Sequence, residues 1–174
     1  MVSLATIGLF YGSSLGNTET VAEKIRDLLT DHDVEMHDIA ASSPEDFAPY
    51  DYLILGIPTW DYGQIQSDWD EFWTQLGSID FSGKLVALFG LGDQFGYADY
   101  FLDAMGMLHD VVLEQGGSAF GYWSIDGYEF EESKALTQDK QYFVGLAIDE
   151  DQQPELTDER VEAWVAQVVD EFDF

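Results

Sequence analysis

The sequence predicts an α/β protein in which a five-stranded parallel sheet is covered by helices on both faces. Apolar runs alternate along the chain with segments whose apolar residues recur at helical spacing, which is typical of strand–helix–strand units. The apolar runs are nearly continuous, as in strands that are buried on both faces. With 46% hydrophobic and 15% aromatic residues, the chain can fill a core despite a net charge of -29. Its 174 residues favour a single domain, residues 1–174.

The opening stretch, residues 4–20, predicts a strand, a loop and a helix that together suit a phosphate group. An apolar run at 7–11 leads into a glycine- and hydroxyl-rich loop at 12–18, and apolar residues then recur at helical spacing over 21–29. Backbone N–H groups at a helix start and side-chain hydroxyls are good donors to phosphate. The loop has no Lys or Arg, which excludes a nucleoside-triphosphatase loop, and the G-x-G-x-x-G dinucleotide pattern is also missing. Taken alone, the loop could equally be an ordinary strand-to-helix turn.

The next two strands differ in their patterns. Residues 34–39 alternate apolar and polar side chains and predict an edge strand, whereas the apolar run at 52–57 predicts a central one. We expect Pro58 to end that central strand. The loop 58–64 then places aromatic side chains at the strand's carboxyl end. The helix after the loop carries core residues at spacing i, i+3, i+4, i+7: Trp69, Phe72, Trp73 and Leu76.

A fourth strand is predicted at 84–91, where the chain is again apolar. A loop at 92–98 separates it from the next helix. That helix has one apolar face, made of Tyr100, Phe101, Ala104, Met105, Leu108, Val111 and Val112. Gly116 and Gly117 are predicted to end it.

The fifth strand is predicted in two parts. It begins at 119–123 and resumes at 143–148, and the residues between them show no helical period. Such a long excursion inside a strand is uncommon and usually has a function or belongs to a subfamily. The last helix is predicted to start at a Thr157 cap, with acids in its first turn. Its apolar face is Val161, Trp164, Val165, Val168 and Val169.

Charge is the unusual quantity in the composition. The chain has 35 acids and 6 bases, and no Lys or Arg occurs in residues 27–83 or in residues 85–133. Such a surface repels nucleic acid and anionic membranes and favours fast encounters with basic proteins. A solvated acidic coat, suited to a salty cytoplasm, explains the same composition equally well.

Other classes of protein are excluded by composition. The chain has no Cys, so disulfides, thiolate catalysis and Cys-ligated metals are ruled out. No run of 18 apolar residues occurs, and residues 1–4 precede the first strand without a basic or apolar leader. We therefore expect a cytoplasmic protein that does not enter a membrane.

Three loops are expected to meet at one edge of the sheet, because ligands of such sheets bind beyond the carboxyl ends of the strands. These loops begin at Gly12, Pro58 and Leu91. Together they offer a phosphate-binding loop without a charged donor and two loop aromatics, Trp60 and Tyr97. The combination predicts a planar ring held between the aromatics and a phosphorylated tail below it.

The sequence gives little support for a metal site or a catalytic triad. The acidic run 149–151 has no His near it in sequence, so we expect no dedicated metal site. His32, His37 and His109 are scattered, are expected to be exposed, and lack the spacing of a catalytic triad.

Four segments resemble the flavodoxins of the long-chain type, over the full length of the chain. They are GSSLGNTE at 12–19, IPTWDYGQIQSDW at 57–69, GLGDQFGYADYF at 90–101 and FVGLAIDEDQQPELTDERV at 143–161. The resemblance implies a flavodoxin-like three-layer sandwich with strand order 2-1-3-4-5, the order known for flavodoxins. It identifies the interrupted fifth strand with the long-chain insertion.

The resemblance also implies a function. A flavodoxin is a low-potential one-electron carrier with non-covalent FMN that shuttles between semiquinone and hydroquinone and has no catalytic residues of its own. Its expected partners are basic redox proteins such as a ferredoxin/flavodoxin-NADP reductase, and we expect a monomer. Acids around the flavin and the absence of a base would disfavour the anionic hydroquinone, since two unit charges about 10 Å apart cost roughly 1.7 kcal/mol at a dielectric of 20.

Binding residues follow from the resemblance position by position. Those implied for the phosphate are Ser13, Ser14, Gly16, Asn17 and Thr18, with Leu15 where relatives often have Thr. Those implied for the ring are Trp60 and Tyr97 on its faces with Thr59 nearby, the Asp61–Tyr62 peptide at N5, and Gly92, Asp93, Asp99 and Tyr100 at the pyrimidine edge. Asp151, or else Asp149, would meet the ribityl chain, and neighbours in the same loops complete the set: Pro58, Gly63 and Leu91. Gln64 occupies a site that is frequently Glu.

Two other classes of protein remain as alternatives. An NAD(P)H-dependent FMN quinone or azo reductase on the same fold would need an open ring face and basic residues for the nicotinamide nucleotide. A flavin-free signalling module of receiver type would need an acidic phosphoacceptor at the end of a strand and a lysine after the last strand. The paired aromatics and the scarcity of Lys and Arg favour the electron carrier.

Overall fold

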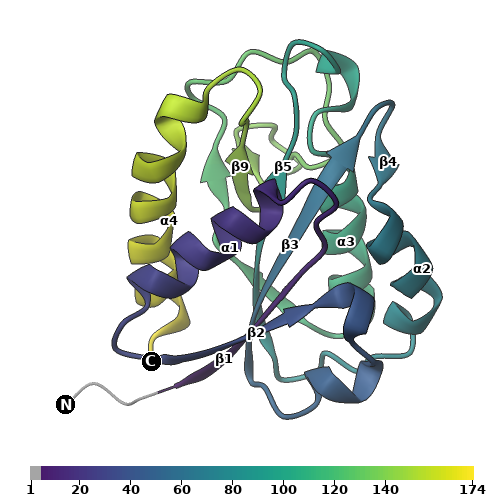
Figure 1. Cartoon of the computed structure of the whole chain (residues 1–174), viewed down its shortest axis with the longest axis vertical. Coiled ribbons are helices and arrows are strands. Elements are labelled where there is room, and N and C mark those ends of the chain that lie inside the picture. Colours follow the sequence, from purple (N-terminus) through teal and green to yellow (C-terminus); the bar gives the residue numbers. More distant parts are fainter. Residues whose placement is uncertain (1–4) are drawn as a thin grey trace.

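The computed structural model of the chain describes residues 5–174 and consists of a central sheet between two layers of helices (Figure 1). Leu4, where the predicted opening stretch begins, lies outside the described residues. The strands are β1 (Thr6–Tyr11), β2 (Asp33–Asp38), β3 (Tyr52–Trp60), β4 (Gln64–Ile65), β5 (Leu85–Leu91), β6 (Ser118–Phe120), β7 (Trp123–Ser124), β8 (Tyr142–Phe143) and β9 (Leu146–Ile148). The helices are α1 (Asn17–Leu28), α2 (Ser67–Leu76), α3 (Asp103–Glu114) and α4 (Thr157–Phe172), with short 3-10 turns η1 (Ile39–Ala41), η2 (Pro44–Phe47), η3 (Ala98–Tyr100) and η4 (Pro154–Leu156).

The main strands run parallel in the order β2-β1-β3-β5, with β6 and β9 both paired to β5 at the far edge. Helices α1 and α4 cover one face and α2 and α3 cover the other (Figure 1). The predicted α/β class, with a parallel sheet between helices, is confirmed.

Burial on both faces explains why the strands are continuously apolar. In β1, Ile7 and Leu9 belong to the core cluster under α1 and α4, whereas Phe10 belongs to the cluster under α2 and α3. In β3, Ile54 faces the first cluster and Leu55 the second. Each strand therefore needs apolar side chains at successive positions.

The fifth strand is interrupted as predicted, but its inner boundaries differ from the prediction. Within the two predicted parts of this strand, β6 and β9 are the segments that pair with β5, whereas Trp123 and Phe143 pair with each other in the separate antiparallel hairpin β7-β8. Gly121 turns the chain out of the sheet with a φ of 78°, and a Cβ there would lie 2.9 Å from the indole nitrogen of Trp164. Apolar residues have the same pattern in either sheet, so the sequence could not separate them.

Residues 121–145 form an insertion that folds back onto α3. Aromatic rings of the insertion surround Phe101, with Tyr128, Phe130 and Phe143 at centroid distances of 5.6–6.0 Å. The buried Asp103 carboxylate accepts a hydrogen bond from the Lys134 amide at 2.8 Å. The insertion is thus part of the hydrophobic core and not a loose loop.

The partly buried Tyr128 phenol of the insertion should make stability depend on alkaline pH. Its hydroxyl donates to the Ala147 carbonyl at 2.6 Å, and burial raises its pKa to about 12. Because the folded pKa lies above the unfolded value near 10, this group stabilises the fold below pH 10, and the stabilisation is lost as pH rises from about 10 to about 12. We expect it to contribute at most about 2.7 kcal/mol to the change between pH 9 and pH 12. In urea titrations at several pH values, Tyr128→Phe should show a shallower decline than the parent chain; an equal decline would contradict the assignment.

Two details of the predicted elements are wrong. Strand β3 continues through Pro58 to Trp60. Pairing with β1 ends at Gly56 and pairing with β4 begins at Thr59, so the proline stands between these two pairings, where it is tolerated. Thr157 is the first helical residue of α4 rather than its cap, and its buried hydroxyl oxygen has no hydrogen-bond partner among residues 5–174. The turn η4 leads into α4 instead of a side-chain cap.

Two other expectations on single residues are also wrong. Tyr100 lies in η3, before α3, and its side chain is not part of the helix's apolar face. His109 is buried, and burial lowers its pKa; His32 and His37 are half-buried. None of the helices within residues 5–174 is long and apolar enough to cross a membrane.

Candidate functional site

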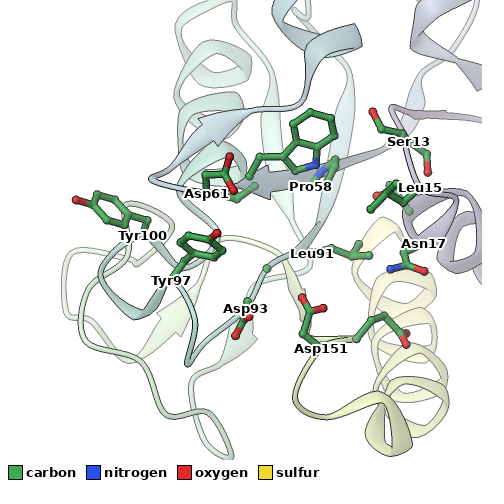
Figure 2. A pocket seen from close by; sticks show the side chains of 16 residues that line it. Ser13, Leu15, Asn17, Pro58, Asp61, Leu91, Asp93, Tyr97, Tyr100 and Asp151 are labelled. Carbon is green, nitrogen blue, oxygen red and sulfur yellow. The ribbon is translucent and has the colours of Figure 1, made fainter.

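A cavity of about 400 Å³ opens at the carboxyl edge of the sheet, where the loops after β1, β3, β5 and β9 meet (Figure 2). Its size lies within the range of small-ligand sites. The lining residues are Ser13, Ser14, Leu15, Asn17, Thr18, Pro58, Thr59, Trp60, Asp61, Leu91, Gly92, Asp93, Tyr97, Tyr100, Glu150 and Asp151.

One end of the cavity is built by the loop between β1 and α1. Gly16 has a φ of 92°, which lets the loop turn into the helix, and its amide donates to the Ser13 hydroxyl oxygen at 3.0 Å. In the described chain no side chain caps α1, so the first N–H groups of the helix remain free to face a ligand. Hydroxyls of Ser14 and Thr18 line the same end. Free N–H groups, hydroxyls and a helix N-terminus suit an anion.

Aromatic residues line the opposite end. Trp60, at the end of β3, and Tyr97, in the loop after β5, both face the cavity. In Figure 2, Tyr97 and Tyr100 lie at the far side from Ser13, Leu15 and Asn17. Tyr97 remains 37% exposed, so its ring has a free face. The Asp61 carboxylate raises the pKa of the Tyr97 phenol, first as a hydrogen-bond acceptor and second through its negative charge.

The turn 61–63 borders the aromatic end with unusual backbone angles. Asp61 has a φ of 44° and Gly63 a φ of 82°, so a non-glycine residue occupies the left-handed region two positions before an adaptable glycine. A strained residue of this kind at a cavity is a common feature of functional loops. A Cβ on Gly63 would lie 2.9 Å from the carboxylate of Asp103, which leaves glycine as the residue that fits.

A buried carboxylate joins the two remaining loops of the cavity. Asp149 is fully buried and accepts four hydrogen bonds: one oxygen binds the backbone and side-chain amides of Gln94 at 3.0 and 2.9 Å, and the other binds the amides of Asp151 and Gln152 at 3.1 and 2.9 Å. Gln94 is also fully buried, and its side-chain oxygen accepts from the Glu129 amide at 2.5 Å. The loops that carry Tyr97 and Asp151 are therefore both bonded to one buried side chain, and through Gln94 to the insertion.

Charges around the cavity are all negative. Among the described lining residues four are acids, Asp61, Asp93, Glu150 and Asp151, and none is Lys or Arg. Desolvation, followed by the charge of Asp93, raises the pKa of Asp151, so this carboxyl already senses its anionic neighbours. For Asp93, burial acts to raise the pKa, but hydrogen bonds from Gly96, Gln152 and Phe95 outweigh it and the pKa is lowered. An additional negative charge beside these groups is unfavourable.

Most residues predicted to bind a ligand line the cavity, and a few do not. Gly16, Tyr62, Gly63 and Asp99 are predicted but do not line it. The Tyr62 ring packs edge-on against Tyr97 at 5.9 Å, and Asp99 is exposed. Glu150 lines the cavity although the sequence analysis does not include it, and its only signal is its place beside Asp151.

The arrangement suits an amphiphilic ligand with two different ends. Uncharged donors at the α1 end can hold a phosphate group, and the apolar, aromatic end can hold a planar ring.

Comparison with known proteins gives a consistent result. The family model for flavodoxin matches residues 9–164. Flavodoxin from Klebsiella pneumoniae is 55% identical over 168 residues, covering 97% of this chain and 95% of that protein. A flavodoxin from a Nostoc strain is 53% identical over 166 residues, covering 95% and 96%. The crystal structure of Fusobacterium nucleatum flavodoxin bound to flavin mononucleotide superposes with a TM-score of 0.91 at 33% identity, covering 97% of this chain and 99% of that one.

Proposed function

Because this chain belongs to the flavodoxin family, we propose that it binds one FMN non-covalently in the cavity and carries single electrons between partner proteins. The observation that carries the proposal is the cavity itself. It has neutral phosphate donors at one end, aromatic side chains at the other, and acids but no basic side chain in its described lining. When bound, FMN supplies a flavin ring that takes up and releases electrons one at a time. The chain acts as an electron carrier and not as an enzyme.

The residues present fit this cofactor. Ser13, Ser14, Asn17 and Thr18, with the free N–H groups at the start of α1, would hold the phosphate. Trp60 and Tyr97 would enclose the ring, and the free face of Tyr97 supports this role. Gly92, Asp93 and Tyr100 would lie along the ring's pyrimidine edge, and Asp151 would meet the ribityl chain.

The turn 61–63 would face the reactive edge of the ring. Its positive φ angles at Asp61 and Gly63 support a peptide between Asp61 and Tyr62 that can change orientation at low cost. The chain's own part in electron transfer is to exclude water from the ring, to orient it, and to set the surrounding charge. No side chain needs to move a proton for these tasks.

Partner docking is proposed from charge. The net charge of -29 and the acids around the cavity support steering toward basic redox proteins, such as a ferredoxin/flavodoxin-NADP reductase. The same charge makes copies of the chain repel one another, which supports a monomer. The proposal is thus a monomeric, single-domain cytoplasmic carrier.

A reductase function on the same fold is not favoured. A nicotinamide nucleotide would bring further phosphates to a cavity whose described lining contains no basic side chain. Direct oxidation of NADPH by the purified holoprotein would reverse this preference.

The purified protein should be yellow, and denaturation should release FMN that chromatography identifies. A dithionite titration should then proceed in two separate one-electron steps, the first of which produces a new long-wavelength absorption band. A folded but colourless protein that takes up no FMN would contradict the proposal, as would a single two-electron step.

A further inference from the structure

Gln66 is a fully buried polar residue that the binding scheme above does not use. It lies between β4 and α2, and its side chain reaches under the loop that follows β1. Gly12 makes room for it, because a Cβ at Gly12 would collide with the Gln66 side-chain oxygen. The absence of a side chain at Gly12 thus brings an amide into contact with the phosphate end of the cavity.

The orientation of the Gln66 amide is fixed by its neighbours. Its Oε1 accepts from the backbone N–H of Trp69 at 3.2 Å, and a backbone N–H can only donate. Its Nε2 donates to the Asp68 carboxylate at 2.8 Å and to Ser14 Oγ at 3.0 Å. A flipped amide would place an oxygen against the Asp68 carboxylate and an NH₂ group against the Trp69 N–H, so only one orientation satisfies all three partners.

This orientation decides what the Ser14 hydroxyl can do. A hydroxyl has one proton, and because Ser14 Oγ accepts from Gln66, that proton must point away from the amide. Ser14 is exposed and lines the cavity. The Ser13 hydroxyl is also an acceptor on one side, because its Oγ accepts a hydrogen bond from the Gly16 amide at 3.0 Å. Both hydroxyls are therefore left to donate toward the cavity.

We infer that Gln66 is a positioning residue that presets Ser14 as a hydrogen-bond donor, so that the loop favours a fully ionised phosphate monoester, which can only accept. The inference rests on the proposed FMN function. It matters in this chain because the described lining contains no Lys or Arg, so phosphate affinity depends on neutral donors held in place before binding.

The test replaces the donor by an acceptor of the same shape. Gln66→Glu is made in an Asp68→Asn background, which serves as the parent of this series, so that no second carboxylate faces the new one. One carboxylate oxygen of the glutamate can still accept from Trp69, whereas the other faces Ser14 and draws its proton away from the cavity. Flavin fluorescence quenching by the apoprotein should show FMN affinity reduced roughly 10–100-fold, the worth of one hydrogen bond to a charged group. Riboflavin, which has no phosphate, should bind within about 3-fold of the parent.

The matched control is Gln64→Glu, two residues away. Gln64 is exposed, and the hydrogen bond to Ser14 comes from Gln66. Gln64→Glu therefore introduces the same side chain and the same charge without removing a donor to Ser14. It should alter FMN affinity by less than about 3-fold, which separates the loss of a donor from the addition of a charge. A loss as large as that of Gln66→Glu would overturn the inference.

Ser14→Ala completes a double-mutant cycle. Alone it should weaken FMN roughly 10–100-fold and leave riboflavin unchanged, and in its background Gln66→Glu should have little further effect. A full effect of Gln66→Glu without Ser14, or an equal loss for riboflavin, would overturn the inference while the FMN function stands. If the buried glutamate prevents folding, the exposed Ser14→Ala variant decides, and unchanged FMN affinity there overturns it. A parent chain that binds neither flavin would instead refute the proposed function.

Discussion

Replacing Asp149 with leucine should lower the free energy of unfolding by about 3–5 kcal/mol. The carboxylate accepts four hydrogen bonds, and the two donors on Gln94 belong to a fully buried residue that would lose this partner without access to water. Urea unfolding of the apoprotein measures the change without the contribution of bound cofactor.

Two further variants serve as comparisons for the loss of unfolding free energy in Asp149→Leu. Asp149→Asn retains one acceptor oxygen and should cost about 1–2 kcal/mol. Asp126→Asn makes the same exchange at an exposed acid and should stay within about 0.5 kcal/mol of the parent. If Asp149→Leu were no less stable than Asp126→Asn, the carboxylate would not hold the two loops together. FMN affinity should fall with Asp149→Leu as well, because Tyr97 and Asp151 lie on the released loops.

Neutralising Glu150 and Asp151 together should raise the midpoint potential of the second one-electron reduction by roughly 35–140 mV at low ionic strength. Each charge about 10 Å from an added negative charge costs about 0.4 kcal/mol at a dielectric of 80 and about 1.7 kcal/mol at 20. For one electron, 59 mV corresponds to about 1.4 kcal/mol. Both acids line the cavity, and no hydrogen bond to either carboxylate is formed in the described chain, so Glu150→Gln with Asp151→Asn removes charge with little change of structure.

The matched control is a pair of acids at the other edge of the sheet. Asp31 and Asp33 lie at the amino end of β2, whereas the cavity lies at the carboxyl ends of the strands. Asp31→Asn with Asp33→Asn removes the same charge and should shift the potential far less. In 0.5 M NaCl, potentiometric titration should give a smaller shift of the midpoint potential for the Glu150 and Asp151 pair, because the Debye length is then only a few ångströms. Equal shifts for both pairs would mean that net charge, and not the local cluster, sets the potential.

Local patterns predicted the layers of the fold and the place of the cavity. The apolar runs at 7–11, 52–57 and 84–91 all form parallel strands, because a strand buried on both faces has a distinct composition. The carboxyl ends of such strands share one edge, so the loops after them had to meet. That Trp60 and Tyr97 face one cavity followed from topology without knowledge of any side-chain position.

Features that depend on distant partners could not be predicted. Asp149 was predicted only as the alternative to Asp151 at the ribityl chain, whereas its position in the structure depends on Gln94, 55 residues away. Gln66 belongs to no periodic pattern in the sequence. Its contact with Ser14, 52 residues away, is evident only in the folded structure. The boundaries near Trp123 and Phe143 failed for a related reason, because the choice between the main sheet and a small hairpin is made by packing and not by local pattern.

The two parts of the interrupted strand, β6 and β9, pair with β5 in one continuous register. Phe120 stands opposite Ala87 and Leu146 stands opposite Phe89, so a single position on β5, Leu88, separates the two paired segments. One residue joining Phe120 to Leu146 would therefore restore an unbroken strand in its present alignment. Replacing residues 121–145 with a single residue would therefore preserve the strand order and the cofactor edge of the sheet. It would also remove the aromatic cover over Phe101 and the contact between Glu129 and Gln94.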